Sequence, residues 1–355
     1  MNAPLFKPIK LGELSLSNRI VMAPMTRCRA IGNLASALMQ TYYQLRAGAG
    51  LIISEGISPS PNGLGYARIP GLFNEAQVQS WKRVTDAVHQ VGGRIFAQLM
   101  HTGRVSHPLN MPAGARIIAP SAIAAPGEMW TDASGQQPHP LPEAMSEEDI
   151  ALAIGAYAKA ARLAMMAGFD GIELHAANGY LIDQFLNTAS NLRNDRWGGS
   201  VDNRIRFAVE VMRACATVIG AERVGMRISP YGVFNGQVAD AAMDAMYLRL
   251  VEDANALGLL YLHVVDHSSM GAPAVSPALK AKMRAAFEGK YILSGGYDAA
   301  RANADLEADR GDLVAFGRPF IANPDLVDKL RDGRELAAAD FNTFYTPGPQ
   351  GYTEL

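Results

Sequence analysis

The sequence has little that would place it among disulfide-rich, membrane-spanning or nucleic-acid-binding proteins. Only two of its 355 residues are cysteine, Cys28 and Cys215, which is too few for a disulfide framework or a cysteine-based metal cluster. Lysine and arginine number 32 against 34 aspartate and glutamate residues, so the chain lacks the basic field that attracts nucleic acid. The longest apolar stretch, 151–169, is interrupted by Lys159 and Arg162 and is too short to span a membrane comfortably.

The first residues also lack the features of a secretory signal peptide. Met1-Asn2-Ala3-Pro4 contains neither a charged n-region nor an apolar core. Together with the low cysteine content, this predicts a cytoplasmic protein with reduced thiols and no membrane or nucleic-acid partner. Hydrophobic residues make up 49% of the chain, which excludes a disordered or fibrous protein and is enough for a large core.

What the sequence does contain is a repeated alternation of short apolar runs and segments with helical periodicity. Eight such pairs predict parallel βαβ units and, together, a closed (β/α)8 (TIM) barrel of the α/β class. An open doubly wound sheet is the alternative, but no Gly-x-Gly-x-x-Gly follows the first run. The expected strands are 19–26, 51–57, 94–101, 171–175, 224–229, 259–265, 291–294 and 313–316, and the expected helices are 36–48, 75–90, 147–167, 201–219, 239–257, 277–288, 298–309 and 323–332.

Two segments depart from this alternation. Residues 102–146 contain seven prolines and no helical period, which predicts a lid or hairpin excursion after the third strand, over the catalytic mouth. Residues 1–18 alternate apolar and polar positions and predict a hairpin that plugs the opposite end of the barrel. The chain 1–355 is therefore expected to form a single barrel domain.

Helix caps support the expected boundaries. Ser146-Glu147-Glu148-Asp149 predicts a capping box at the start of the third helix. Asn323-Pro324 predicts an N-cap followed by a proline at the first position of the last helix.

In a barrel of this kind the active site lies on the loops that follow the strands. Gly295-Gly296 and Gly317-Arg318 follow the seventh and eighth strands, where barrels often bind phosphate through backbone N–H groups, a helix N-terminus and a guanidinium. Ordinary tight turns and a surface ion pair of Arg318 are the alternative interpretation.

The fourth strand is followed by His175-Ala-Ala-Asn178-Gly-Tyr180. A histidine and an amide across such a turn can both donate hydrogen bonds to one oxygen, which stabilises negative charge that develops there. The phenol of Tyr180 can give up a proton. A core histidine, a turn asparagine and a packing tyrosine remain the alternative.

Arg227 lies in the expected fifth strand, where a buried arginine needs an anionic partner. That partner is either a structural carboxylate, such as Glu173 or Glu55, or a cofactor that carries negative charge. His101 and His107 have no clustered acidic residues beside them, which favours structural roles over a metal site. Cys28 is expected to be a buried, inert thiol.

Taken together, these motifs identify a resemblance to the old yellow enzyme family of flavin-dependent ene-reductases, in the branch that includes morphinone reductase. The resemblance covers nearly the whole chain. It is most specific over 175–185 and 190–204, and it is supported by Ala23-Pro-Met-Thr26, by 97–104 and by Val314-Ala-Phe-Gly-Arg-Pro319.

The resemblance implies a barrel that binds FMN non-covalently and is reduced by NADH or NADPH. Thr26, on the loop Pro24-Met25-Thr26, would bond the flavin O4, and Gln98 would bond the pyrimidine edge. Arg227 would stabilise negative charge near N1 and O2. His175 and Asn178 would bind the substrate carbonyl, with Tyr180 as proton donor. The remaining residues implied are Gly56, Gly295, Gly296, Gly317 and Arg318 for the cofactor, and Tyr66, Met100, Asn235 and Tyr345 for the substrate pocket.

The implied substrates are small α,β-unsaturated carbonyl compounds, with nitro compounds and nitrate esters as further acceptors, and the expected assembly is a monomer or a homodimer. Met100 stands where close relatives have tryptophan, and Thr26 stands where another branch has cysteine, so neither pocket width nor redox tuning carries over. Two alternatives remain. One is a phosphate-binding barrel lyase or isomerase, in its metal-dependent form with His101 and His175 as ligands, and the other is a flavin-binding protein without turnover.

Overall fold

The computed structural model describes residues 3–355, and its centre is a closed barrel of eight parallel strands. The strands follow one another around the barrel in chain order, and the last pairs with the first through Val314 opposite Ile20. The predicted (β/α)8 barrel is thus confirmed. The barrel strands are β3 (Ile20–Met22), β4 (Leu51–Ile57), β5 (Ile95–Leu99), β10 (Gly171–Ala176), β11 (Val224–Ile228), β12 (Tyr261–Val265), β13 (Lys290–Ser294) and β14 (Leu313–Phe316).

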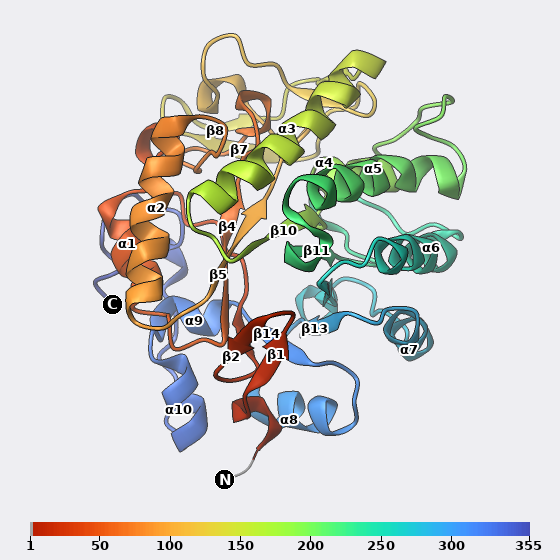
Figure 1. Cartoon of the computed structure of the whole chain (residues 1–355). Helices are drawn as coiled ribbons and strands as arrows, with labels where there is room; N and C mark the ends of the chain where they lie inside the picture. Colours follow the sequence, from red (N-terminus) through yellow and green to blue (C-terminus); the bar gives the residue numbers. More distant parts are fainter. Residues whose placement is uncertain (1–2) are drawn as a thin grey trace.

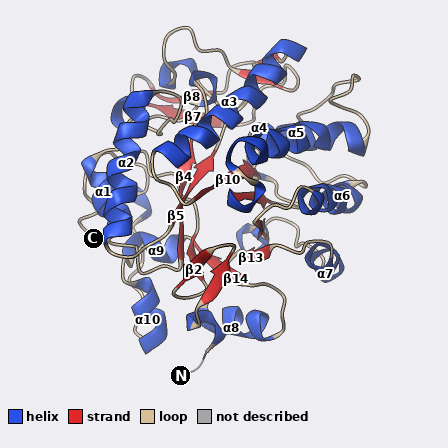
Figure 2. Cartoon of the chain, in the orientation of Figure 1, coloured by secondary structure: helices blue, strands red, loops and turns tan. Residues whose placement is uncertain are grey.

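Helices surround the strands, as Figures 1 and 2 show. The strands are buried on both faces because helices cover them outside and side chains fill the barrel inside, which explains their nearly continuous apolar sequences. No helix within residues 3–355 is long and apolar enough to cross a bilayer. The outer helices are α1 (Ala37–Gln44), α2 (Glu75–Gln90), α3 (Glu147–Met166), α5 (Val201–Ile219), α6 (Met243–Ala256), α7 (Pro277–Ala285), α8 (Ala299–Glu307) and α10 (Leu326–Asp332), with the short helices α4 (Leu181–Leu186) and α9 (Arg318–Ala322) after β10 and β14.

The predicted plug is an antiparallel hairpin of β1 (Ile9–Leu11) and β2 (Leu14–Leu16). Leu11 and Leu16 are buried in the same cluster as residues of the barrel interior, among them Phe96. Figure 1 shows this hairpin at one end of the barrel and the hairpin of the 102–146 excursion at the other. The plug therefore closes the end from which the strands start and leaves the C-terminal end for the loops.

The excursion 102–146 contains the antiparallel hairpin β7 (Glu128–Thr131) and β8 (Gly135–Pro138), and β6 (Ile118–Ala119) pairs with β9 (Glu143–Ala144). Val105 and Met129 from the excursion form a small apolar cluster on which Tyr66 and Tyr180 pack. The excursion thus lies against Tyr66 of the expected substrate pocket and against the expected proton donor Tyr180, and its action as a lid remains a prediction.

One of the two expected helix caps is confirmed and the other is wrong. Ser146 Oγ accepts the Asp149 N–H at 3.1 Å, and Asp149 returns a bond to the Ser146 N–H at 2.9 Å. The last helix, however, begins at Leu326 after Asp325, because the buried Asn323 amide is used elsewhere. Its Oδ1 accepts from the Ala337 N–H and from Lys329 Nζ, and so ties down the chain that follows the helix.

Candidate active site

His175 lies near the C-terminal end of β10, opposite Arg227 in the register with β11. Its Nδ1 accepts a hydrogen bond from the Ala177 N–H at 3.3 Å. Burial lowers the pKa of His175 well below its usual value, and the nearby Arg227 guanidinium lowers it further. A neutral imidazole whose Nδ1 is an acceptor carries its proton on Nε2. His175 therefore offers an Nε2–H donor.

Asn178 is held in the left-handed region of the backbone, with φ of +62°. Its N–H donates to Ser229 Oγ at 2.9 Å, and its carbonyl accepts from Asn235 Nδ2 at 2.7 Å. The side-chain Oδ1 lies 2.7 Å from His267 Nε2. Because Oδ1 is turned toward His267, the NH2 end of the amide is the end left for a ligand, so Asn178 is also a donor.

Tyr180 stands at the start of α4, with its ring edge-to-face against His175 at a centroid distance of 4.9 Å. Its Oη lies 3.0 Å from the Oη of Tyr66. Burial raises the pKa of Tyr180 to about 12, so the phenol keeps its proton at neutral pH. The turn after β10 thus combines two N–H donors with a protonated phenol.

Arg227 is buried at the same end of the barrel, and its Nε has no hydrogen-bond partner among residues 3–355. Neither structural carboxylate considered from the sequence forms a hydrogen bond with Arg227, although the nearby Glu173 charge opposes the lowering of its pKa by burial. Glu173 accepts from Gln98 Nε2 and lies 2.8 Å from His263 Nδ1, and Glu55 accepts from the Tyr43 hydroxyl at 3.3 Å. A buried guanidinium whose Nε lacks a hydrogen bond is costly, so this position suits an anionic group supplied by a ligand.

The Gln98 amide is oriented by its bond to Glu173, with Nε2 to Oε1 at 2.8 Å. That bond uses one of its two N–H donors, so the second N–H and the carbonyl oxygen remain for a ligand. Gln98 and Glu173 lie opposite each other on neighbouring strands β5 and β10. Gln98 can thus accept a hydrogen bond from a ring N–H, as the resemblance implies for the edge of a flavin.

The loop Pro24-Met25-Thr26 is half-buried and lies beside the end of β14. A Cβ built on Gly317 would stand 3.7 Å from Met25 Sδ, so the loops after the first and eighth strands are in contact. Arg318 is exposed and takes part in none of the ion pairs formed within 3–355, so the surface pair considered as an alternative is not found there.

Gly295 and Gly296 have φ of +123° and +64°. A Cβ on Gly295 would lie 2.0 Å from the Asp266 carbonyl oxygen, and one on Gly296 would lie 2.7 Å from Ser269 Cβ. Close packing against the loop after β12 therefore requires glycine at both positions, whatever else they bind. Sequence reasoning missed Arg301, which donates to the Gly295 carbonyl at 2.9 Å from α8, because no motif marks it.

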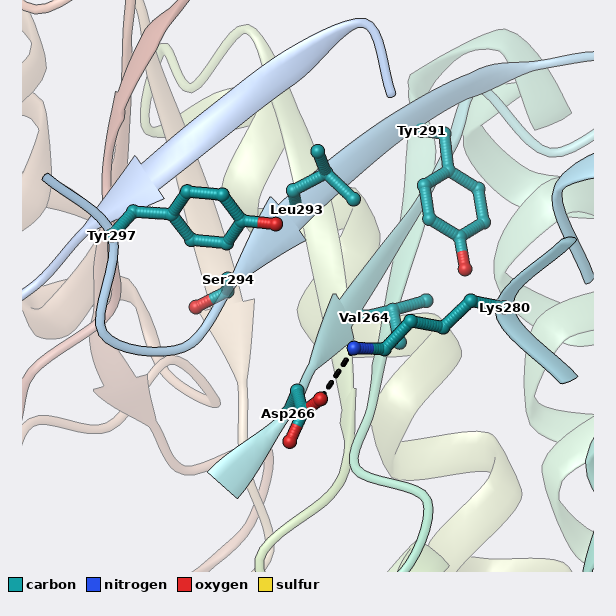
Figure 3. A pocket seen from close by; sticks show the side chains of 7 residues that line it. All are labelled: Val264, Asp266, Lys280, Tyr291, Leu293, Ser294 and Tyr297. Carbon is teal, nitrogen blue, oxygen red and sulfur yellow. Dashed lines mark hydrogen bonds and ion pairs between the residues drawn. The ribbon is translucent and has the colours of Figure 1, made fainter. Parts of the chain in front are cut away.

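Figure 3 shows side chains that line a small cavity, among them Ser294 and Tyr297, which flank the two glycines in the sequence. Asp266 at the end of β12 forms an ion pair with Lys280 of α7 across it, and Tyr291 and Tyr297 complete its wall. The ion pair supports the base of the loop that packs on Gly295. The cavity is thus part of the scaffold of the site.

Replacing Gly295 by alanine is expected to destabilise the protein by about 3 kcal/mol, because the added methyl group meets backbone. Gly114→Ala is the matched control, since Gly114 has φ of +82° but nothing within 4 Å of its Cβ position. It should cost only about 1 kcal/mol. Urea unfolding of both variants measures the difference, and equal losses would mean that the clash with Asp266 is relieved.

The residues expected to line the substrate pocket make different contacts in the structure. Met100 is 1% exposed, and its Sδ fills the space that a Gly56 side chain would need. Asn235 uses its amide to hold the Asn178 carbonyl. Tyr345 is half exposed on the C-terminal tail, where its carbonyl accepts from Arg68 at 2.9 Å.

The two histidines for which a metal site was not favoured accept hydrogen bonds from backbone N–H groups. His101 Nδ1 accepts the Gly103 N–H, and His107 Nδ1 accepts the Leu109 N–H. Cys28 is buried, and burial raises the pKa of its thiol to about 12, which agrees with the expectation of an inert thiol.

Comparisons with known proteins agree with this geometry. The sequence model of the NADH:flavin oxidoreductase / NADH oxidase family matches residues 4–337. A probable flavin mononucleotide-dependent alkene reductase of Leishmania infantum is 42% identical, over 99% of this chain and 96% of its own. Morphinone reductase is 44% identical with a TM-score of 0.95, over 100% of this chain and 96% of its own. Another solved structure of that enzyme, at a TM-score of 0.93, is a complex with tetrahydroNAD, and it matches 99% of this chain and 96% of its own.

Proposed function

The chain belongs to the NADH:flavin oxidoreductase / NADH oxidase family, and we propose that it is an FMN-dependent reductase of α,β-unsaturated carbonyl compounds. One observation carries the proposal. His175 Nδ1 and Asn178 Oδ1 are both already occupied, so both side chains offer only N–H donors from one turn. Two donors on a carbonyl oxygen stabilise the negative charge that develops there when the alkene is reduced.

The residues around Arg227 suit a flavin. The chemistry that bound FMN supplies is transfer of a hydride from NAD(P)H to the β-carbon of the alkene. Arg227 would offset negative charge on the ring, and the Gln98 carbonyl would accept from a ring N–H. The other residues that we propose for FMN are Pro24, Met25, Thr26, Gly56, His175, Gly295, Gly296, Gly317 and Arg318.

Tyr180 would supply the proton. Its hydroxyl bonds Tyr66 in the structure, and its raised pKa keeps it protonated until a carbanion forms at the α-carbon. Tyr66, Met100, Asn235 and Tyr345 would shape the pocket in which the enone lies. Nitro compounds and nitrate esters are further proposed acceptors, because they also present an oxygen to His175 and Asn178.

A spectroscopic assay tests the proposal directly. Protein loaded with FMN should absorb near ~450 nm, lose that band on addition of NADH or NADPH, and regain it on addition of cyclohex-2-enone. Protein that binds no FMN would refute the cofactor, and bound FMN that neither nicotinamide reduces would point to a flavin-binding protein without turnover.

Tyr180→Phe is expected to slow enone reduction by about 10²-fold, because it removes the hydroxyl proton but keeps the ring against His175. Flavin reduction by NAD(P)H should continue. Stopped-flow measurement of the two half-reactions separates these effects. Tyr66→Phe is the matched control, since it removes the neighbouring hydroxyl and should slow enone reduction less. Undiminished enone turnover in Tyr180→Phe would assign protonation to water or another group.

A further inference from the structure

His267 contacts the site from a loop for which the sequence motifs indicate no role. It begins the 3-10 turn η7 (His267–Met270), one residue after the end of β12, and it is 8% exposed. Its Nε2 lies 2.7 Å from Oδ1 of Asn178, which is 89 positions away in the sequence. The contact therefore joins the loop after the sixth strand to the loop after the fourth.

An asparagine side chain needs such a contact if it is to act as a donor. Its amide has an acceptor end and a donor end of almost the same shape, and rotation by 180° exchanges them. Ser229 and Asn235 hold only the backbone of Asn178. His267 is the partner of the side-chain oxygen, so it decides which end of the amide is left for a ligand.

The imidazole is itself fixed in place. Its ring lies edge-to-face on Phe234 at a centroid distance of 4.7 Å. The preceding Asp266 caps the turn, since its Oδ1 accepts the Ser268 N–H at 3.0 Å, and its Oδ2 pairs with Lys280, as Figure 3 shows. The Asp266 N–H also donates to the Ser294 carbonyl at 3.0 Å. The loop is thus anchored to both β13 and α7.

We infer that His267 is a positioning residue that donates to Asn178 Oδ1 and thereby keeps the Asn178 NH2 group directed at the substrate oxygen. The inference rests on the proposed function, because it concerns the same carbonyl-binding pair. Without the histidine, the amide can turn its oxygen toward the substrate oxygen, and two acceptors facing each other repel.

Three substitutions of His267 separate this role from simple packing. The probe is phenol, whose oxygen would accept the hydrogen bonds of His175 and Asn178. His267→Gln places an amide NH2 near the position of Nε2 and should keep the affinity for phenol within about threefold of wild type. His267→Leu removes the donor and should weaken phenol binding by about tenfold. His267→Glu substitutes a carboxylate that accepts from the Asn178 NH2 group and turns it away, so it should weaken binding by about 10²-fold.

Calorimetric titration of the FMN-loaded enzyme with phenol measures these affinities. In an Asn178→Ala background, His267→Leu should cause no further loss, because the group that it orients is gone. Met270→Leu, on the same turn and 53% exposed, is the control for disturbance of the loop and should match wild type.

Two outcomes overturn the inference. Equal phenol affinity of wild type, His267→Gln and His267→Leu would show that Asn178 needs no orienting partner. An undiminished effect of His267→Leu in the Asn178→Ala background would show that His267 acts on the pocket by another route. Wild-type enzyme that binds neither FMN nor phenol would instead refute the proposed function, which keeps the two failures distinct.

Discussion

Replacing both His175 and Asn178 by alanine is expected to slow enone reduction by about 10⁴-fold. Removal of one donor to a developing oxyanion typically costs about 10²–10³-fold, and this variant removes two. Hydrogen bonds within the protein hold both side chains with their N–H donors in a fixed direction. Water that fills the space left by the two alanines has no such fixed orientation. The rate of flavin reoxidation by cyclohex-2-enone in stopped flow measures the loss.

The binding of phenol provides a second measurement for the same variant. The affinity should fall strongly, because the phenol oxygen loses both hydrogen bonds. His107→Ala is the matched histidine control, since His107 holds only the Leu109 N–H on the excursion. If the double variant bound phenol as tightly as wild type, the carbonyl-binding role of the pair would be wrong.

Replacing Arg227 by methionine is expected to raise the Kd for FMN by about 10²-fold, because a hydrogen-bonded charge pair with the ring is lost. The effect on the apoprotein should have the opposite sign. Burial lowers the pKa of Arg227 by more than the nearby Glu173 charge raises it, and its Nε has no hydrogen-bond partner in the described part of the chain, so we expect the charge to destabilise the empty barrel. An apolar side chain of similar volume removes that cost.

Thermal unfolding with and without FMN tests both expected effects, the weaker binding of FMN and the higher stability of the apoprotein. The Tm of the apoprotein should rise in Arg227→Met, and the further rise that FMN produces should shrink. Arg223→Met, an exposed arginine just before the same strand, should change neither quantity. A lower apoprotein Tm for Arg227→Met would mean that the guanidinium has stabilising partners in the empty protein and does not depend on a ligand for them.

The fold was largely predictable because its signals are local. Continuous apolar runs such as Leu51–Ile57 reflect burial on both faces, and eight of them in alternation with helices leave few topologies. The ends of elements were less predictable. The first strand is only Ile20–Met22, since the chain after it leaves the barrel to form the Pro24–Thr26 loop, and Asn323 caps no helix because a distant N–H of Ala337 competes for its side chain.

The candidate site, too, was predictable from the sequence only in part. The types of residue in His175–Tyr180 and their position after a strand are visible in the sequence, and so is the need of Arg227 for an anion. The sequence does not show which atoms of these residues remain free to bind a ligand. That depends on Ala177, His267 and Glu173, whose hydrogen bonds are set by how the loops and strands lie in space.

The sequence by itself thus determined the barrel, the plug at one end and the identity of the groups at the other, because hydrophobic period and strand order are properties of neighbours along the chain. Only the tertiary structure decided the direction of each donor, because an imidazole or an amide takes its orientation from a partner that folding brings to it. His267 and Asn178, far apart in the sequence and in contact across two loops, are the clearest instance.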